Sequence, residues 1–131
     1  MEELSKGKKI LIVEDDQFLR EFYQELLMAE GYFIDVASDG EMALPKIWEN
    51  EYDLLLLDIM LPKKDGLEIL RELKNQPPKS AKVKIVVLTN LGQDAVIKEC
   101  FDLGAQGYLI KSALNPDQVL QEIKSYLQKT T

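Results

Sequence analysis

The sequence DLLLLDIMLPKKDG, residues 53–66, contains an uninterrupted apolar run that ends in an acid. Leu54 to Leu57 offer no polar face, which is typical of a strand that is buried on both sides in a parallel sheet. Asp58 follows at once, and a carboxylate at the edge of a core is costly unless another group pairs with it. This stretch therefore predicts a covered parallel strand that carries a partnered carboxylate at its carboxyl end.

Four further apolar runs have the character of strands, and they alternate with segments of helical periodicity. The predicted strands are 8–14, 32–38, 52–58, 82–90 and 107–111, and the predicted helices begin near residues 16, 39, 67, 93 and 115. Five strands alternating with five helices indicate an α/β fold with one parallel sheet covered on both faces. Right-handed crossovers restrict the topology, and we expect a doubly wound (βα)5 domain with the flavodoxin-like strand order 2-1-3-4-5.

The length and charge of the chain limit the kinds of protein it can be. We expect residues 1–131 to form a single domain with its core at about 8–128. The formal net charge of −7 argues against nucleic acid as the main partner. No apolar run approaches the ~18 residues of a membrane span, and no signal peptide opens the chain, so we expect a cytoplasmic protein without a membrane partner.

Histidine is absent from the sequence. This absence excludes Ser-His and Cys-His catalysis and any His-ligated metal. A metal ion here would have to be a hard, oxygen-bound cation, and Mg²⁺ is the first expectation. If a phosphohistidine takes part in the chemistry, it belongs to another protein.

Polar side chains end four of the five predicted strands. In chain order they are Glu14, Asp15, Asp16, Asp58, Thr89 and Lys111. Each alone has an ordinary structural explanation, such as a helix N-cap for an acid that precedes a helix. Together they matter more, because the ligand site of this topology lies beyond the carboxyl ends of the first and third strands. We therefore expect these side chains to meet at one edge of the sheet.

Such a group of side chains suits phosphoryl transfer. Carboxylates that lie within several ångströms of one another repel strongly in a partly buried site, and a divalent cation would relieve the repulsion. Asp58 could then act as an oxygen nucleophile towards phosphorus, while Mg²⁺ and Lys111 neutralise phosphoryl oxygens and the Thr89 hydroxyl hydrogen-bonds one of them. The product would be an acyl phosphate on Asp58.

The motifs ILIVEDD, LLLLDIMLPKKDG, IVVLTN and GAQGYLIK together resemble those of the receiver domains of bacterial two-component response regulators. The resemblance covers about residues 8–128 and implies a phosphoprotein that takes its phosphoryl group from a sensor histidine kinase or a histidine phosphotransfer protein. It implies altered binding to a downstream effector on the surface of the fourth helix, fifth strand and fifth helix, about residues 93–128. It also allows a phosphorylation-dependent homodimer, and it implies a domain that assists its own phosphorylation without turning over an external substrate.

The resemblance assigns roles to individual residues. Asp58 is implied to be the phosphoacceptor, Lys111 its ion-pair partner after phosphorylation, and Thr89 the conformational switch. The implied Mg²⁺ ligands, direct or through water, are Asp15, Asp16, Asp58 and the main-chain carbonyl of Met60. Tyr108 matches a family aromatic that turns inward when Thr89 is drawn to the phosphoryl group; a half-buried strand aromatic is the alternative for this chain.

Three features depart from the family pattern. Ser112 replaces the usual proline after the lysine, and we expect a trans bond before it because a cis bond would cost about 3 kcal/mol. Asn90 replaces a small residue, and we expect Asn90 and Met60, which border the route of the hydrolytic water, to set the phosphoryl lifetime. Pro45 lies beyond the first turn of a helix that starts near Asp39, so it predicts a kink or a later helix start.

Two other readings compete with a phosphorylated receiver. A phosphohydrolase with an aspartate nucleophile would need that nucleophile on the first strand with a second acid two residues on, and a long insertion for a substrate cap. Here the acids are contiguous and no such insertion is present. A receiver that binds partners without phosphorylation usually lacks an acid, the threonine or the lysine, and this chain retains all of them.

Overall fold

The computed structural model describes residues 7–90, 93–112 and 115–128, in which five strands alternate with five helices. The strands are β1 (Lys9–Val13), β2 (Phe33–Ala37), β3 (Leu54–Asp58), β4 (Lys84–Thr89) and β5 (Gly107–Ile110). The helices are α1 (Gln17–Met28), α2 (Gly40–Glu49), α3 (Gly66–Asn75), α4 (Asp94–Asp102) and α5 (Pro116–Gln128). Each predicted element is present, with ends that differ by a few residues.

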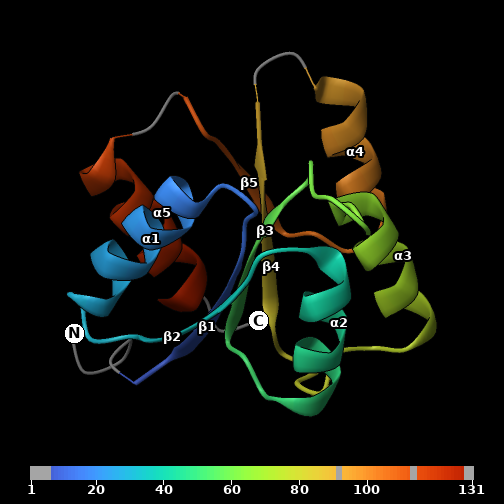
Figure 1. The fold of residues 1–131 in the computed structure, drawn as a ribbon, viewed down its shortest axis with the longest axis horizontal. Coiled ribbons are helices and arrows are strands. Elements are labelled where there is room, and N and C mark those ends of the chain that lie inside the picture. Colours follow the sequence, from blue (N-terminus) through green and yellow to red (C-terminus); the bar gives the residue numbers. More distant parts are fainter. Residues whose placement is uncertain (1–6, 91–92, 113–114, 129–131) are drawn as a thin grey trace.

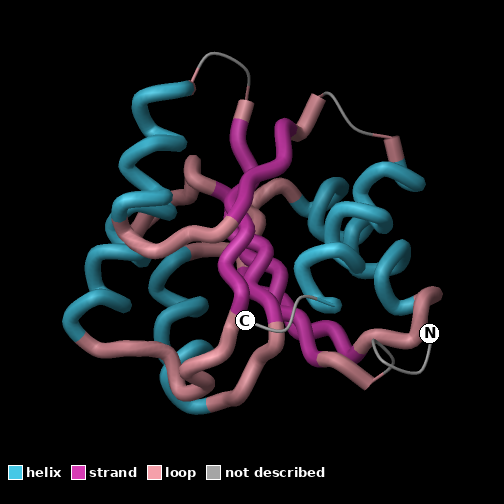
Figure 2. Tube along the Cα trace, turned by 180° about the vertical axis from the view of Figure 1, so that it is seen from behind, coloured by secondary structure: helices cyan, strands magenta, loops and turns pink. Residues whose placement is uncertain are grey.

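The strands form one parallel sheet in the order β2-β1-β3-β4-β5, which confirms the predicted topology. Helices α1 and α5 cover one face of the sheet, and α2, α3 and α4 cover the other (Figure 1). The view from behind shows the same three layers, with the strands between two groups of helices (Figure 2). Among the described residues, none of the helices has the length and apolar character that crossing a bilayer requires.

Strand β3 lies at the centre of the sheet and has no solvated face. Leu54 to Leu57 are each 0% exposed. Leu55 and Leu57 pack in the cluster that includes side chains of α2 and α3, whereas Leu54 and Leu56 pack in the cluster beneath α1 and α5. The alternation of side chains along a strand thus explains why the run is apolar at every position.

The strand register brings the carboxyl ends of the inner strands to one level. Leu57 pairs with Val13 on one side and with Val87 on the other, and Val87 pairs with Tyr108 on β5. The residues that follow this row therefore leave the sheet at the same edge. This edge is where the polar side chains at the strand ends come together.

Two glycines fix the loop that connects β3 to α3. A Cβ atom on Gly66 would lie 2.7 Å from the Cα of Ile59 and 2.9 Å from the carbonyl oxygen of Asp58. A Cβ atom on Gly40 would lie 2.2 Å from the carbonyl oxygen of Lys64, which brings the loop against the start of α2. The missing side chains allow backbone to approach backbone, and this holds the segment after Asp58 in place.

Helix α2 corrects one expectation from the sequence. Asp39 caps it by accepting a hydrogen bond from the Met42 N–H at 2.8 Å, and the helix begins at Gly40 and continues through Pro45. The later start that Pro45 suggested is therefore wrong, because the cap is strong enough to begin the helix before the proline. Pro45 still has no N–H to donate within the helix, so a local kink stays a prediction.

Candidate functional site

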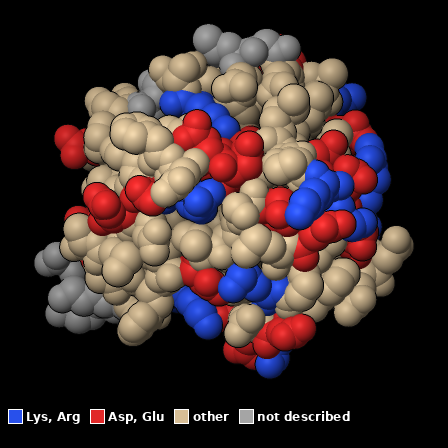
Figure 3. Space-filling model, in the orientation of Figure 1, with Lys and Arg blue, Asp and Glu red and all other residues tan. Residues whose placement is uncertain are grey.

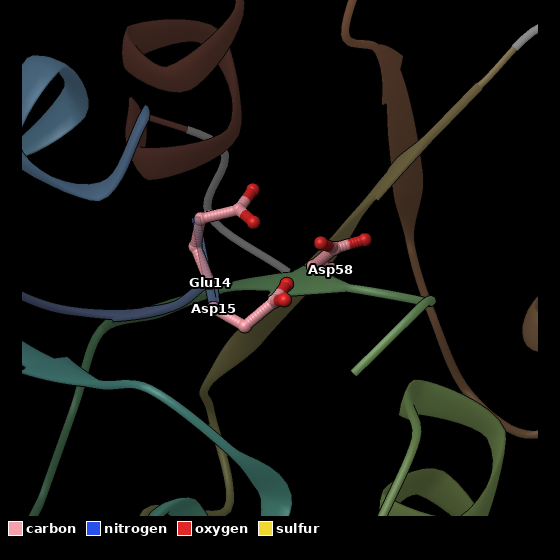
Figure 4. Close-up of side chains that lie close together, drawn as sticks. All are labelled: Glu14, Asp15 and Asp58. Carbon is pink, nitrogen blue, oxygen red and sulfur yellow. The ribbon is translucent and has the colours of Figure 1, made fainter. Parts of the chain in front are cut away.

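Three carboxylates meet at the carboxyl ends of β1 and β3. Oxygen atoms of Glu14, Asp15 and Asp58 all lie within 4.8 Å of one another. Figure 4 shows these side chains extending from the two strand ends into the same space. Glu14 is 0% exposed and Asp58 is 2% exposed, whereas Asp15 reaches solvent. A group of carboxylates that is open on one side is suited to a hard divalent cation that keeps some of its water.

Lys111 is the partner that the buried acids require. Its Nζ atom lies 2.7 Å from Oδ2 of Asp58 and 3.0 Å from Oε1 of Glu14. Burial alone would lower the pKa of Lys111, but its hydrogen bond to Asp58 and its close charge interactions with Asp58 and Glu14 outweigh that effect, so the pKa is raised. Lys111 therefore remains a cation, and it offsets part of the negative charge of the cluster.

Glu14 is the buried acid of the site whose surroundings disfavour its charged form. Burial, followed by the close approach and negative charge of Asp58, raises the pKa of Glu14 to about 7, although Lys111 and the Asp16 N–H act in the opposite direction. Its Oε1 atom is within ion-pair distance of Lys111 but has no hydrogen-bond partner of acceptable geometry. A buried carboxylate oxygen without such a partner is rare, and a metal ion or its water would satisfy it.

Asp16 does not join this cluster. Its Oδ1 accepts a hydrogen bond from the Leu19 N–H at 3.0 Å, which makes it the N-cap of α1. Of the three consecutive acids, the structure thus groups Glu14 and Asp15 with Asp58 and leaves Asp16 at the helix start. The sequence contains a signal for this difference, because an aspartate directly before a helix is a preferred cap.

Arg20 lies in the first turn of α1 and contacts the main chain of the acids, and sequence reasoning missed it. Its Nη1 atom lies 2.9 Å from the carbonyl oxygen of Glu14 and 3.3 Å from that of Asp15. These contacts tie the loop after β1 to α1. Nothing in the local pattern marks this arginine, because its role depends on a contact between a helix and the preceding loop.

The loop after β3 holds the second oxygen of Asp58. The N–H of Met60 donates to Oδ1 of Asp58 at 3.0 Å, so both carboxylate oxygens have a donor. The Met60 side chain is 59% exposed, at the rim of the site. Asp58 is therefore held in one orientation by one main-chain and one side-chain donor.

Thr89 ends β4 and is 1% exposed. Its hydroxyl is 2.5 Å from Oε1 of Gln93 and 3.2 Å from the carbonyl oxygen of Asn90. Tyr108 lies on β5 with 42% of its surface exposed, and its ring meets that of Phe101 edge-on at 6.2 Å. The threonine is thus buried and hydrogen-bonded, while the tyrosine is directed outwards in this structure.

The segment after β5 agrees with the expected peptide geometry. None of the peptide bonds in the described residues is cis, so the bond between Lys111 and Ser112 is trans, as expected for a non-proline residue. The N–H of Lys111 donates to the carbonyl oxygen of Thr89 at 2.8 Å, which continues the pairing of β4 and β5 up to the site. The rest of the 111–114 loop lies outside the described residues.

Charges of both signs are distributed over the face seen in Figure 3. Lysines and arginines are scattered there among aspartates and glutamates. On this face the positive charges lie next to negative ones, so neither sign dominates it.

Comparison with known proteins finds bacterial transcriptional regulatory proteins among the relatives of this chain. The chain is 33% identical over 123 residues to the transcriptional regulatory protein ResD of Bacillus subtilis, which covers 94% of this chain and 49% of that protein. It is 36% identical over 122 residues to the transcriptional regulatory protein CpxR of Escherichia coli, which covers 93% of this chain and 50% of that protein. The chain thus spans about half the length of these relatives.

Solved structures show the same fold. A putative response regulator from Chloroflexus aurantiacus is 31% identical with a TM-score of 0.83, covering 95% of this chain and 100% of that chain. The receiver domain of a sensor histidine kinase from Pseudomonas aeruginosa is 26% identical with a TM-score of 0.82, covering 94% of this chain and 99% of that chain. That structure has a magnesium ion coordinated in its active-site cleft.

A family model for the response regulator receiver domain matches residues 10–124, which include the three clustered acids, Thr89 and Lys111. The sheet order, the acidic cluster and the matched length agree with one another. The chain therefore belongs to the response regulator receiver domain family.

Proposed function

We propose that Asp58 of this receiver domain accepts a phosphoryl group from a phosphohistidine of a sensor histidine kinase or a histidine phosphotransfer protein. The observation that supports this most directly is the setting of Asp58. It is 2% exposed at the end of the central strand, and Lys111 and the Met60 N–H hold its two oxygens at 2.7 and 3.0 Å. A carboxylate that is oriented in this way can present an oxygen to an incoming phosphorus atom with little loss of entropy.

The acidic cluster is the proposed site of Mg²⁺. Its donors are all oxygens, and Oε1 of Glu14 is buried without a hydrogen bond, so the residues present fit such an ion. We assign Asp15, Asp58 and the main-chain carbonyl of Met60 to its shell, with Glu14 beside them, directly or through water. Glu14 replaces Asp16 in this assignment because the carboxylate of Asp16 caps α1. When bound, the ion would neutralise charge on the phosphoryl oxygens.

The residues of the chain account for the rest of the transfer. An oxygen of Asp58 forms a bond to phosphorus as the bond between phosphorus and the imidazole nitrogen of the partner breaks, which gives an acyl phosphate. Lys111 moves its ion pair from the carboxylate to a phosphoryl oxygen, and the Thr89 hydroxyl donates to another. Attack of water on phosphorus returns Asp58 to its carboxylate. The domain assists both steps on itself and turns over no external substrate.

The output surface is proposed to be the one made by α4, β5 and α5. Phe101 and Tyr108 are each 42% exposed and lie in edge-on contact on this side of the sheet. A change at Thr89 reaches them through α4 and through the neighbouring strand β5. The partner there would be a downstream effector protein or domain, or a second copy of the chain, and the proposed location is the cytoplasm.

The test is the intact mass of the protein after incubation with acetyl phosphate, with and without Mg²⁺. We expect a Mg²⁺-dependent gain of one phosphoryl group in the wild type and none in Asp58→Asn. Asp102→Asn, which alters an exposed aspartate in the last turn of α4, is the matched control and should gain the group. A gain that persists in Asp58→Asn would overturn the assignment, and so would a wild type that neither gains mass nor binds beryllofluoride.

A further inference from the structure

The hydroxyl of Thr89 is already engaged by a side chain that the proposed mechanism does not use. Oε1 of Gln93 lies 2.5 Å from Oγ1 of Thr89 and also accepts the N–H of Asn90 at 3.2 Å. Gln93 immediately precedes α4, so this contact connects the end of β4 to the start of the next helix. Thr89 is 1% exposed, which leaves water little access to the hydroxyl, and the carbonyl oxygen of Asn90 is a more distant acceptor at 3.2 Å.

The hydrogens of this contact can be assigned from the chemistry of the groups. The Asn90 N–H is a donor only, so the atom of Gln93 that faces it must be the amide oxygen rather than the nitrogen. The same oxygen faces Thr89, and therefore the threonine hydroxyl must be the donor. A hydroxyl carries one proton. Thr89 cannot donate to Gln93 and to a phosphoryl oxygen at the same time.

The start of α4 differs from that of the other helices. Within the described residues, the other four helices begin with a side-chain cap, supplied by Asp16, Asp39, Asp65 and Asn115. Gln93 makes no such cap at α4, because its side chain is turned back towards Thr89 and Asn90. The side chain of Gln93 thus contacts the end of β4 instead of capping the helix that it precedes.

We propose that Gln93 is a latch that holds the Thr89 hydroxyl in the unphosphorylated state and thereby sets how readily the domain takes up a phosphoryl group. This inference rests on the proposed function of Asp58. The latch bond exists only before phosphorylation, whereas the bond from Gln93 to the Asn90 N–H does not need to change. Removing the acceptor on Gln93 should therefore favour the phosphoryl-bound state.

The latch also gives a route to the output surface. Release of Thr89 frees the Gln93 side chain at one end of α4, and Phe101, in the last turn of the same helix, lies edge-on against Tyr108. Because coupling between two sites is reciprocal, a partner that shifts α4 should alter the affinity of the domain for the phosphoryl group. Gln93 is thus a positioning residue that acts through Thr89.

The experiment measures binding of beryllofluoride, a phosphoryl mimic, by calorimetry in saturating Mg²⁺. Gln93→Leu and Gln93→Met keep the bulk of the side chain and remove the acceptor. We expect each to tighten beryllofluoride binding by about 2-fold to 10-fold, the effect of one ordinary hydrogen bond lost from one of two states. Mg²⁺ affinity without beryllofluoride should be unchanged. Gln118→Leu is the matched control, because it removes a glutamine oxygen that accepts a main-chain N–H at the start of α5.

Repeating the Gln93 substitution in a variant that lacks the Thr89 hydroxyl separates the latch from a general effect on folding. In Thr89→Val the hydroxyl is gone, and adding Gln93→Leu should then leave beryllofluoride affinity unchanged. An unaltered or weaker affinity in both single Gln93 variants would overturn the latch, and so would equal tightening with and without the hydroxyl. A wild type that neither binds beryllofluoride nor gains mass with acetyl phosphate would overturn the proposed function itself, which distinguishes the two failures.

Discussion

The ammonium group of Lys111 lies 2.7 Å from Oδ2 of Asp58, although β4 lies between β3, which Asp58 ends, and β5, which Lys111 follows. The side chain of Lys111 reaches across the edge of the sheet and also meets Glu14 at 3.0 Å. One cation therefore serves two buried acids that belong to different strands. The stability of this edge and the reactivity of Asp58 depend on the same contact.

Removing that cation should destabilise the fold. Lys111→Met leaves Glu14 and Asp58 buried without their counter-ion, and we expect a loss of about 2–4 kcal/mol in the free energy of unfolding near neutral pH. Urea denaturation without Mg²⁺ measures it. Lys46→Met, which breaks a pair with Asp35 whose side chains are both 33% exposed, should cost less than about 1 kcal/mol. Equal losses in the two variants would contradict the role of burial.

The raised pKa of Glu14 predicts a pH dependence of stability. Its pKa is about 7 in the folded protein, against 4.5 for a freely solvated glutamate, so between these values the folded state retains a proton that the unfolded state releases. The contribution of Glu14 is therefore fully present below pH 4.5 and is lost as the pH rises through about 7. It amounts to at most about 3–4 kcal/mol, at about 1.4 kcal/mol per pKa unit.

The variant Glu14→Gln isolates this effect. Urea unfolding of both proteins without Mg²⁺, from about pH 5 to pH 8, should show the wild type losing stability relative to the variant as the pH rises. A difference that is constant or grows in favour of the wild type would contradict the assigned direction. Adding Mg²⁺ should reduce the slope, because a cation beside Glu14 favours the charged carboxylate.

Gly66→Ala should destabilise the protein because backbone lies close to Gly66, although helix propensity alone predicts that this substitution stabilises it. Alanine at the first position of α3 is the better helix former. Its Cβ would nevertheless lie 2.7 Å from the Cα of Ile59, and backbone would have to move. We expect Gly66→Ala to destabilise the protein by about 1–3 kcal/mol and to slow phosphorylation of Asp58. Thermal unfolding and the rate of mass gain with acetyl phosphate check both parts; a more stable variant would contradict the first.

The rim of the site should control the lifetime of the acyl phosphate. The side chain of Met60 is 59% exposed, and Asn90 follows the buried Thr89 directly in the chain. We expect Met60→Ala and Asn90→Ala to change the dephosphorylation rate, measured by loss of phosphoryl mass after the donor is removed. Met28→Ala, which alters a methionine 54% exposed at the end of α1, is the control and should leave the rate unchanged. Unchanged rates in both rim variants would refute the idea.

Most of the fold could be predicted because β3 is apolar at every position and the other strands are separated by helical patterns. In this topology the ligand site lies beyond the carboxyl ends of the strands, which predicted that Asp58, Thr89 and Lys111 lie at one edge of the sheet. The observed strand register supports that prediction. The rule did not resolve which of three consecutive acids would face Asp58. That choice depends on where β1 ends and α1 begins, and Asp16 is used by the helix cap.

The contacts of Arg20 and Gln93 could not be predicted from the sequence. Each is a long side chain on or next to a helix that reaches back to the preceding strand end or loop. Their partners are main-chain carbonyls in one case and a hydroxyl and an N–H in the other. Such contacts depend on the relative placement of helix and strand, which residue periodicity does not encode. The start of α2 near Asp39 was predicted correctly, and the structure excludes the later start that Pro45 offered as one of two alternatives.

The order of strands in the sheet has one further consequence. The acids come from β1 and β3, whereas Thr89 and Lys111 come from β4 and β5, so the central strand divides the site into two halves. In the proposed function, the half towards β1 would hold the cation, and the half towards β5 would contact the phosphoryl group. We therefore expect substitutions beside β1 to act mainly through Mg²⁺ affinity, and substitutions beside β5 to act on the contacts of the phosphoryl group. The rate of phosphorylation and the choice of downstream partner could therefore change independently as related receiver domains evolve.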